Sequence, residues 1–305
     1  MSEITAAKVK ELREKSGAGM MDAKKALQET NGDMEAAVDF LRKKGLAKAE
    51  KKSSRTAAEG LVAIVSQGTT GAVVEVNSET DFVARNEQFQ SFVKQIADTA
   101  LTVEDTAALM GADLEGKSVQ DTLTDNIATI GENMSVRRME KLSVNDGAVV
   151  GYVHNPVAPN LGKIGVLVAL ESTGDKAALE SLGKQLAMHV AAAFPQCLNA
   201  EQADQDALER ERNIIRETAL AEGKPADIVE KMLEGRMKKY LKEICLMDQI
   251  FVIDGETSIE NVLKNAEKEV GAPVELKAYS RIQLGEGIEK EEEDFAAEVA
   301  KAANG

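Results

Sequence analysis

Eight residues in the middle of the chain, Gly111–Ser118, carry the pattern that most suggests chemistry. Their sequence, GADLEGKS, has the spacing of a phosphate-binding loop, in which backbone N–H groups and a lysine surround the phosphates of a nucleotide. Glu171 follows a hydrophobic strand pattern, where an acid that holds a metal ion would stand. The surroundings disfavour this chemistry, because residues 102–110 predict a helix where a buried strand is needed, and Asp113 and Glu115 would bring negative charge to the phosphates. A nucleotide-binding enzyme is kept as an alternative hypothesis.

The two histidines do not form a catalytic pair. His154 and His189 lie far apart in sequence and on different predicted elements. His189 falls on the inner face of a predicted helix, which favours a core or interface histidine over a ligand. His154 begins a predicted irregular loop with Pro156 and Pro159, a position that suits a residue in contact with a partner. Since no nucleophile elbow, metal-ligand cluster or dinucleotide-binding pattern occurs, we expect no catalytic residue, no cofactor and no metal site.

The cysteines are equally uninformative about catalysis. Cys197 and Cys245 are the only two in 305 residues, and their spacing favours neither a disulfide framework nor a metal site. Two isolated thiols are typical of a protein in a reducing cytosol. The sequence has no charged-then-apolar leader and no run of about 18 apolar residues, so neither export nor a membrane span is predicted. We therefore expect a cytoplasmic protein.

The balance of charge limits the kind of partner. The chain has 52 acidic and 37 basic residues, and its formal net charge is -15 at pH 7. Such a surface would on average repel a phosphate backbone or an anionic membrane, so we expect neither direct nucleic acid nor a membrane as partner. A partner with a basic patch is favoured.

A different kind of candidate follows a strand pattern at residues 73–77. A short polar turn ends the pattern, and Thr80, Asp81, Phe82 and Val83 come next, which places an aromatic ring beside a carboxylate. Large aromatic groups are scarce here, since the chain has 7 Phe and no Trp. Phe82 is either a core residue that closes the end of the strand or an exposed interface anchor on a rigid support.

The elements that must position these residues predict an α+β chain. Three short helices separated by glycines are expected within residues 1–54, and the Lys-rich segment 42–55 is interpreted as a solvated helix or linker rather than a nucleic-acid patch. Two hairpins, each followed by a helix, are expected in the middle of the chain, and the repeated order suggests two α+β halves packed side by side. Their strands are predicted at residues 60–65 and 71–76, and at 147–153 and 164–170.

Residues 201–245 change to a highly charged helical pattern. Narrow apolar seams run to and from a tip at Glu222–Pro225, where a glycine precedes a proline at the start of the returning helix. This pattern predicts an antiparallel helical hairpin that forms an arm rather than a core. The arm is expected to contact a partner or a second copy of the chain. Short strand patterns at 251–253 and 274–284 and a final acidic helix follow.

Five groups of residues then carry a resemblance to a known family. They are Val9–Arg13 with Gly17–Asp22, Thr80–Val83 after its strand, Ile130–Asn133, Gly235–Lys239, and Gly285–Lys290 continued by Asp294–Val299. Together these groups resemble the bacterial elongation factor Ts family. Because they lie in register from the first residues to the last, the resemblance covers essentially the whole chain.

The resemblance implies a translation elongation factor that binds the GTPase elongation factor Tu in its GDP form. It would catalyse GDP release by displacing the magnesium ion and stabilising the nucleotide-free state, which allows GTP to reload. Such a guanine-nucleotide exchange factor is not an enzyme with a covalent catalytic site and needs no cofactor. Thr80–Val83 would enter near the nucleotide site, with Phe82 wedged between helices of the GTPase and Asp81 disturbing the magnesium environment. A purely structural scaffold that uses the arm is kept as a third hypothesis.

Further contacts with the GTPase are implied by the same resemblance. The N-terminal bundle would dock through Lys10, Arg13, Met20 and Met21, and His154 would add a contact of its own. A core role for one of the two methionines is an alternative. The segment from Asn155 to Gly162 is longer than the family's usual short His-Gly turn, and this departure stands directly beside His154.

The expected fold is α+β with an N-terminal three-helix (UBA-like) bundle, a two-part core of duplicated hairpin-plus-helix units, an antiparallel helical hairpin and a C-terminal helix. A homodimer, or a complex with two copies of each protein, through the core or the helical hairpin is left open. The expected parts are residues 1–54 for the bundle with its basic linker, 55–145 for the first half of the core, 146–200 and 246–284 for the second half, 201–245 for the inserted hairpin, and 285–305 for the C-terminal module.

Overall fold

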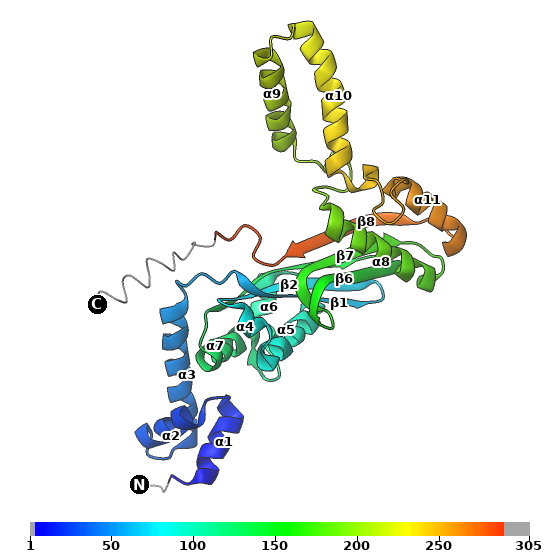
Figure 1. The fold of residues 1–305 in the computed structure, drawn as a ribbon. Helices are drawn as coiled ribbons and strands as arrows, with labels where there is room; N and C mark the ends of the chain where they lie inside the picture. The colour runs from blue at the N-terminus through cyan, green and yellow to red at the C-terminus, as the bar shows by residue number, and fades with distance from the viewer. Residues whose placement is uncertain (1–3, 290–305) are drawn as a thin grey trace. The chain divides into compact units, whose positions relative to one another are not determined.

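A computed structural model of the chain describes residues 4–289, apart from the side chain of Asp227. It is a mixed α+β structure with N-terminal helices, an antiparallel sheet, further helices and a C-terminal strand (Figure 1). The C-terminal helix expected within residues 285–305 lies outside the described residues from residue 290 onward. The chain divides into two compact units, of which one contains residues 4–63, 74–139 and 283–289 and the other residues 64–73 and 140–282.

The first unit begins with three helices, α1 (Ala6–Ser16), α2 (Met20–Glu29) and α3 (Met34–Lys52). Thr5 and Asp33 cap α1 and α3 by accepting hydrogen bonds from backbone N–H groups of the first turn. Gly17 ends α1 in the left-handed region (φ 68), which glycine enters without the strain that a Cβ would cause. The three helices share a small apolar core of Val9, Leu12, Ala23, Ala26, Leu27 and Ala37.

The expected Lys-rich segment is helical, because α3 runs without a break to Lys52. Further along the described part of the chain, this unit contains four more helices and the two strands of a short sheet. They are α4 (Asp81–Ala84), α5 (Glu87–Ala100), α6 (Thr106–Gly111), β3 (Asp113–Leu114), β4 (Lys117–Ser118) and α7 (Val119–Ile130). Helix α5 buries one face, and the helical spacing of its apolar residues explains why: they are Phe89, Phe92, Val93, Ile96, Ala97 and Ala100.

The main sheet contains both predicted hairpins. Its strands are hydrogen-bonded in the order β5-β2-β1-β7-β6, and β8 pairs with β7. The strands are β1 (Glu59–Gln67), β2 (Thr70–Ser78), β5 (Met134–Ser143), β6 (Gly147–Ala158), β7 (Leu161–Glu171) and β8 (Glu275–Gln283). Strand β2 is buried along almost its whole length, which explains its nearly continuous apolar sequence.

The hairpin of β6 and β7 differs from the sequence prediction. We expected an irregular loop after His154, but β6 continues to Ala158 and β7 begins at Leu161. A register shift between Pro156 and Ala158 accommodates the first proline, and β6 is the last strand in the sheet order, where a missing N–H costs no ladder bond. Asn160 makes the tight turn with φ 62, a conformation that asparagine tolerates.

The second unit packs helix α8 (Lys176–Ala193) against the hairpin of β6 and β7. Their shared core includes Val166, Val168 and Leu170 from β7 and Leu179, Leu186 and Val190 from α8. Helix α11 (Ile259–Val270) adds Ile259, Leu263 and Val270 to this core. The predicted strand at 251–253 is wrong: these residues lead into a turn, and only the neighbouring Ile250 forms an isolated bridge, with Ser258.

Residues 201–245, where a helical hairpin is expected, contain α9 (Gln205–Ala221) and α10 (Ala226–Ile244), which are preceded by the short helix η1 (Ala200–Gln202) and followed by η2 (Leu246–Asp248). The two long helices lie side by side (Figure 1). Between the base and the tip they bury Ile215, Ala219, Val229, Leu233 and Met237, while Gly223 turns the chain with φ 78. So narrow a seam leaves most of each helix exposed, as expected for an arm. Across residues 4–289, no helix is long and apolar enough to span a bilayer.

Candidate functional site

The turn after β2 presents Thr80, Asp81, Phe82 and Val83 consecutively. Thr80 keeps an extended backbone (φ -125, ψ 158) and precedes the single helical turn α4. Val83 and the following Ala84 are buried at 5% and 7% exposure, whereas Phe82 is 77% exposed. Because adjacent helical residues point about 100° apart, burying positions 83 and 84 turns the ring of Phe82 outward. Phe82 is therefore an exposed ring on a fixed support and not a core residue.

Glu132 fixes the beginning of this turn. Its Oε2 accepts a hydrogen bond from the backbone N of Thr80 at 3.0 Å, and its Oε1 accepts one from Thr80 Oγ1 at 2.7 Å. Hydrogen bonds to a carboxylate are stronger than those between neutral groups. Glu132 reaches this position because Gly131 ends α7 in the left-handed region (φ 92). The turn is thus anchored across 52 residues of sequence.

A second set of contacts joins the same two segments. Glu79 Oε1 accepts a hydrogen bond from the backbone N of Asn133 at 2.5 Å, and the Glu79 carboxylate lies 3.5 Å from the guanidinium of Arg55. The side-chain amide of Asn133 donates to the carbonyl of Arg55 at 2.7 Å. Residues 131–133 therefore hold both the turn and the segment that enters β1. Sequence reasoning noted this Gly-Glu-Asn group in the resemblance but gave it no role.

Asp81 is held only loosely. Its carboxylate lies 3.5 Å from the guanidinium of Arg85, one turn further along, and both side chains are largely exposed. An exposed ion pair of this kind contributes about 0 to 1 kcal/mol, so the carboxylate can change partner at little cost. The chemistry available here is therefore an aromatic ring and a carboxylate side by side, both directed to solvent.

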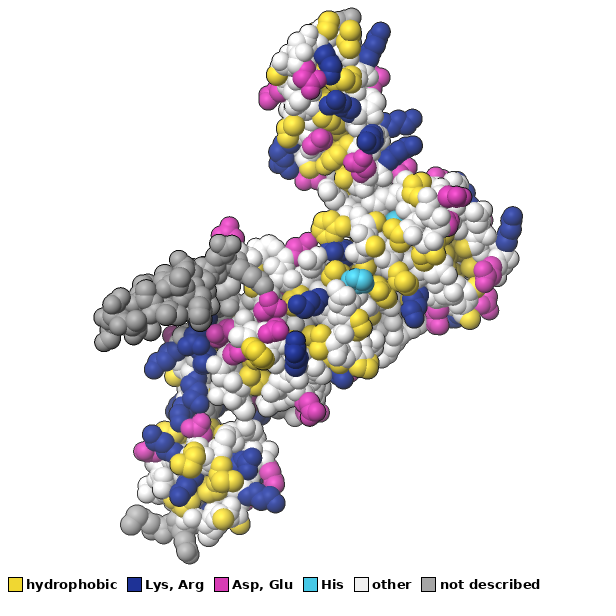
Figure 2. Space-filling view, in the orientation of Figure 1, with side chains coloured by type: hydrophobic (Ala, Val, Ile, Leu, Met, Phe, Trp, Pro, Cys, Tyr) yellow, Lys and Arg dark blue, Asp and Glu magenta, His cyan; other side chains and the backbone are white. Residues whose placement is uncertain are grey.

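The N-terminal helices carry the other expected contact residues of this unit. Met20 and Met21 begin α2 and are 60% and 76% exposed, which excludes the core role considered for one of them. Lys10 and Arg13 lie exposed on α1, and Lys10 makes only a 3.8 Å contact with Glu14. Hydrophobic and basic side chains share the visible face of these helices in Figure 2. The combination offers a soft apolar surface with a positively charged border.

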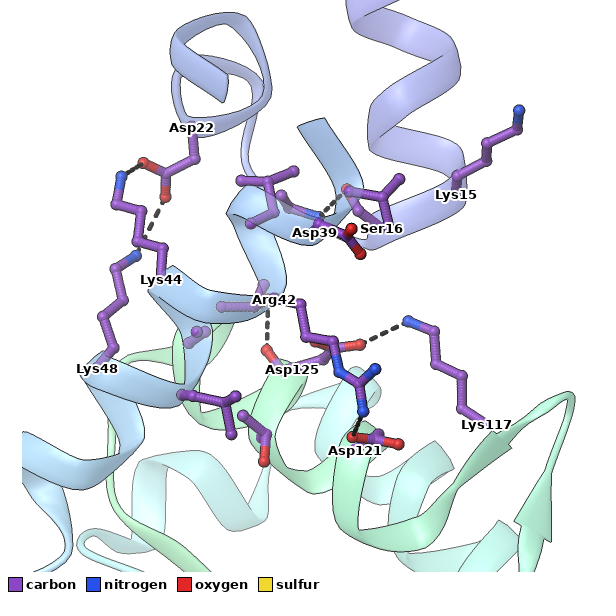
Figure 3. Close-up of a pocket in the computed structure, with 18 of the residues that line it drawn as sticks. Lys15, Ser16, Asp22, Asp39, Arg42, Lys44, Lys48, Lys117, Asp121 and Asp125 are labelled. Atoms are coloured by element: carbon purple, nitrogen blue, oxygen red, sulfur yellow. Dashed lines mark hydrogen bonds and ion pairs between the residues drawn. The ribbon is translucent and has the colours of Figure 1, made fainter. Parts of the chain in front are cut away.

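Helix α3 is tied to α7 by its basic side chains (Figure 3). Arg42 donates to Asp121 at 2.9 Å. Further along α3, the Nζ of Lys52 donates to the carbonyl of Gly131. On the other side of α3, Lys44 and Lys48 donate to Asp22, and these two hydrogen bonds hold the pKa of Asp22 below its usual value. The Lys-rich segment is therefore part of the protein's own framework. Gly131, whose carbonyl accepts the hydrogen bond from Lys52, is followed directly by Glu132, the residue that holds Thr80.

The segment that resembled a phosphate-binding loop has a different structure. Residues 113–118 form a short hairpin with a turn at Glu115 and Gly116, and no buried strand leads into it. Ser118 caps α7, and Lys117 donates to Asp125 at 2.6 Å instead of facing an open loop (Figure 3). The segment lines a cavity of about 650 Å³ together with α3 and α7, and Asp113, Asp121 and Asp125 stand on its wall. A helix follows, but this arrangement lacks the buried strand and the open loop that precede the helix in a nucleotide-phosphate site.

The histidines take separate positions. His154 lies exposed on β6, opposite Ile164, and its Nδ1 is 3.2 Å from the hydroxyl of Tyr152. His189 is fully buried: the backbone N of Val252 donates to its Nδ1, and its Nε2 is 2.9 Å from Gln249 Oε1. Burial lowers the pKa of His189, although the hydrogen bond to Gln249 opposes this. His189 is thus the core histidine of the sequence interpretation. Across residues 4–289 no group of three or more His, Cys, Asp or Glu residues could hold a metal ion.

A buried carboxylate lies on β2, the strand that leads to the turn. Glu75 is fully buried and accepts hydrogen bonds from Arg137 at 3.1 Å, Arg138 at 2.6 Å and the backbone N of Gly285 at 2.7 Å. Burial by itself would raise the pKa of Glu75, but the hydrogen bonds from Gly285, Arg138 and Asn77 outweigh it and hold the pKa below its usual value. This cluster attaches the segment after β8 to the strand that carries the turn.

Comparison with known proteins decides the family. A family model described as elongation factor TS matches residues 79–286. Over 308 residues, the chain is 61% identical to elongation factor Ts of Erythrobacter litoralis (strain HTCC2594), with 100% of both chains covered. It is 62% identical over 307 residues to elongation factor Ts of Rhizorhabdus wittichii, again with 100% of both covered.

The chain belongs to the elongation factor Ts family. It is therefore a translation elongation factor that serves as the nucleotide exchange factor for elongation factor Tu, and it is not a classical enzyme. This confirms the resemblance, the function and the partner expected from the sequence, together with the cytoplasmic location at which translation elongation takes place.

Proposed function

We propose that the turn Thr80–Val83 is the part of this exchange factor that acts beside the nucleotide of elongation factor Tu. Phe82 wedges between helices of the GTPase, and Asp81 disturbs the environment of the magnesium ion. The observation that carries the proposal is the 77% exposure of Phe82 on a turn that is held by Glu132, a residue just after the C-terminal end of α7. An exposed ring on a rigid support meets its partner with little loss of conformational freedom, which is the property of an interface anchor.

The mechanism requires no acid, base or nucleophile. A GTPase grips its nucleotide partly through Mg²⁺ that bridges the phosphates, so disturbing the ion weakens the whole grip. An exchange factor only has to bind the nucleotide-free GTPase more tightly than the GDP-bound form. By linkage, each 1.4 kcal/mol of this difference weakens GDP binding about tenfold. Full burial of one Phe contributes about 1.5 to 3 kcal/mol, so Phe82 alone could supply a difference of this size.

The N-terminal helices supply docking rather than exchange. We assign this role to Lys10, Arg13, Met20 and Met21, because the methionines are exposed and adaptable and the two cations are exposed on the neighbouring helix of the same bundle. His154 is assigned a separate contact, which its exposed position on β6 permits. The partner binds in both its GDP-bound and nucleotide-free forms, without direct nucleic acid.

The finer division of the chain belongs to the same proposal. It comprises a UBA-like bundle with linker at 1–54, core parts at 55–145 and at 146–200 with 246–284, the hairpin at 201–245, and a C-terminal module at 285–305. A homodimer or a complex with two copies of each protein remains a prediction. Sedimentation of this chain alone and with elongation factor Tu distinguishes these assemblies by mass.

Release of GDP provides the direct test. Elongation factor Tu loaded with a fluorescent GDP is mixed with this chain in a stopped-flow instrument, and the rate of release is followed with increasing concentration. Release is expected to accelerate with the wild type and to lose at least tenfold of that acceleration with Phe82→Ala, the loss expected for about 1.4 kcal/mol of differential binding. Circular dichroism and thermal unfolding should not change, because the ring is exposed.

Phe194→Ala is the matched control. Phe194 is the other strongly exposed phenylalanine among the described residues, and its ring stacks with Arg281 at 4.1 Å outside the proposed site. This variant should accelerate GDP release like the wild type. Unaltered release at saturating wild-type protein would refute the exchange role and, with binding retained, support a scaffold. Binding of GTP or ATP to the isolated chain that disappears in Lys117→Ala would support a nucleotide-binding enzyme instead.

A further inference from the structure

The two cysteines, which the sequence placed 48 residues apart, meet in the second unit. Their Sγ atoms are 3.4 Å apart, and both side chains are buried. Cys197 lies just before η1 and α9, and Cys245 directly follows α10. The pair therefore joins the two points at which the helical arm begins and ends. The spacing of the cysteines in the sequence did not indicate a disulfide, because spacing does not show which distant residues lie together in the fold.

We propose that Cys197 and Cys245 form a redox modification site, in which a low-molecular-mass disulfide such as oxidised glutathione converts the two thiols to an intramolecular disulfide at the base of the arm. The modification is independent of the proposed exchange mechanism. It requires no residue of the turn Thr80–Val83.

The backbone already has the arrangement that a disulfide needs. Cys197 and Cys245 face each other in a parallel bridge, with the N of Leu246 donating to the carbonyl of Cys197 at 2.9 Å. The next pair along continues the register, since the N of Met247 donates to the carbonyl of Leu198 at 3.0 Å. Paired strands lie about 4.8 Å apart, and disulfides span Cα distances of about 4.4 to 6.8 Å. Closing the bond therefore needs side-chain rotation and little backbone movement.

The chemistry balances as two thiol–disulfide exchanges. The thiolate of one cysteine attacks a sulfur of the oxidant, which forms a mixed disulfide and releases one oxidant thiol. The second cysteine, as thiolate, attacks the sulfur of the first, which forms the Cys197–Cys245 bond and releases the second oxidant thiol. The two protons of the protein thiols end on the two released thiols. The oxidant gains the two electrons that the protein pair loses.

The surroundings of the two cysteines favour the intramolecular disulfide over separate reactions of the two thiols with oxidant. Burial, the contact with Cys197 and the charge of Asp248 raise the pKa of the Cys245 thiol to about 12, so little thiolate exists in the closed structure. An apolar shell that includes Ala203 and Ile244 covers the pair. Oxidation then requires a local opening of the base of the arm. Once one cysteine has reacted, the other is already its neighbour, so the second step outruns a second encounter with oxidant.

The consequence follows from the position of the pair. A disulfide here encloses the entire arm in a covalent loop whose two ends can no longer separate. The hydrogen bonds that now join these ends, from the N of Gln196 and of Cys197 to the carbonyl of Ile244, would be held closed by the bond. The loop closure removes conformational freedom mainly from the unfolded or opened chain. Opening of the base is therefore expected to become rarer after oxidation.

The full-length protein provides the test. The native chain is incubated with oxidised glutathione, remaining thiols are blocked, and the arm is then cleaved with trypsin before denaturing electrophoresis without reductant. We expect a loss of both titratable thiols, an intact mass lower by two hydrogen atoms, and two arm halves that migrate together until a reductant separates them. Hydrogen exchange of the backbone N–H groups of Leu246 and Met247 should slow at least severalfold after oxidation.

Single variants distinguish the pair from ordinary thiol reactivity. Cys197→Ser and Cys245→Ser should retain a stable glutathione adduct or an unreacted thiol, and their cleaved halves should separate without reductant. The wild-type chain oxidised in denaturant confirms that the oxidant is competent. The proposal is overturned if the native wild type keeps both thiols while the denatured chain is oxidised, if it stops at a glutathione adduct, or if it forms only disulfides between chains.

Discussion

Glu132 receives both hydrogen-bond donors of Thr80, one on each carboxylate oxygen, at 3.0 Å from the backbone N and 2.7 Å from the hydroxyl. The contact joins the end of α7 to the beginning of the exposed turn. Since Lys52 of α3 donates to the carbonyl of the preceding Gly131, the N-terminal helices and the turn are attached to neighbouring residues of one element. If the proposed docking surface and the proposed exchange turn share this support, both can be aligned to one partner.

Replacing Glu132 by Gln tests whether the support matters for exchange. Glutamine has one acceptor oxygen for two donors, and its amide group would face a donor instead of accepting from it, so one donor of Thr80 loses its partner. Hydrogen bonds to charged groups contribute about 1.5 to 3 kcal/mol, which predicts roughly a tenfold or greater loss of GDP-release activity by stopped flow. Glu140→Gln, an exposed glutamate on β5, is the control. Equal activity in the two variants would show that the turn needs no such support.

The two exposed methionines make a prediction about affinity. Met20→Ala with Met21→Ala should leave the thermal unfolding midpoint unchanged, because both side chains are mostly in solvent. Fully burying one Met contributes about 1.5 to 3 kcal/mol, so loss of both at an interface should raise the Kd for elongation factor Tu at least tenfold. Isothermal titration calorimetry measures this. Leu46→Ala is the control. It removes an exposed apolar side chain from α3, another of the N-terminal helices, and should change the Kd for elongation factor Tu little.

The buried Glu75 is predicted to control stability. Glu75→Gln would leave the guanidinium groups of Arg137 and Arg138 without their buried charge partner, which typically costs about 3 to 5 kcal/mol. Urea unfolding followed by circular dichroism measures the change in the free energy of unfolding. Glu87→Gln, on the exposed first turn of α5, is the matched substitution and should have a small effect. A cost for Glu75→Gln as small as that of the control would contradict a structural role for the cluster.

His189 predicts a dependence of stability on pH. Its pKa in the folded chain is below the ordinary 6.5, so below that value the unfolded chain binds a proton that the folded chain does not. The contribution of His189 is therefore fully present above about pH 6.5 and is lost as pH falls toward its folded pKa, by at most about 1.4 kcal/mol per pH unit. Protonation would also set an Nδ1–H against the N–H of Val252.

Urea unfolding of the wild type and of His189→Gln between pH 7.5 and pH 5.5, about one unit on either side of the ordinary value, measures this contribution. The variant should be less stable at the higher pH and should lose less stability on acidification. Glu75 does not interfere in this range, because its folded pKa lies below the ordinary 4.5 and its own contribution is lost only as pH falls below that value. Parallel pH profiles for the two proteins would assign the dependence to other groups.

Local patterns predicted much of the framework correctly. Glycines marked the ends of the N-terminal helices, and the glycine and proline at the tip marked the reversal between α9 and α10. Short-range signals of this kind depend on residues a few positions apart, so a sequence displays them directly. The continuation of β6 beyond His154 was missed because a register shift and an edge position tolerate prolines that otherwise indicate a loop.

The sequence by itself determined the family, the net negative charge and the position of the turn that carries Phe82. Only the tertiary structure decided that this ring is exposed, that Glu132 holds the turn, and that Cys197 meets Cys245. The physical reason is the range of the interactions. Capping, helical period and turn chemistry act between near neighbours, whereas exposure and pairing depend on which distant segments fill the space around a side chain.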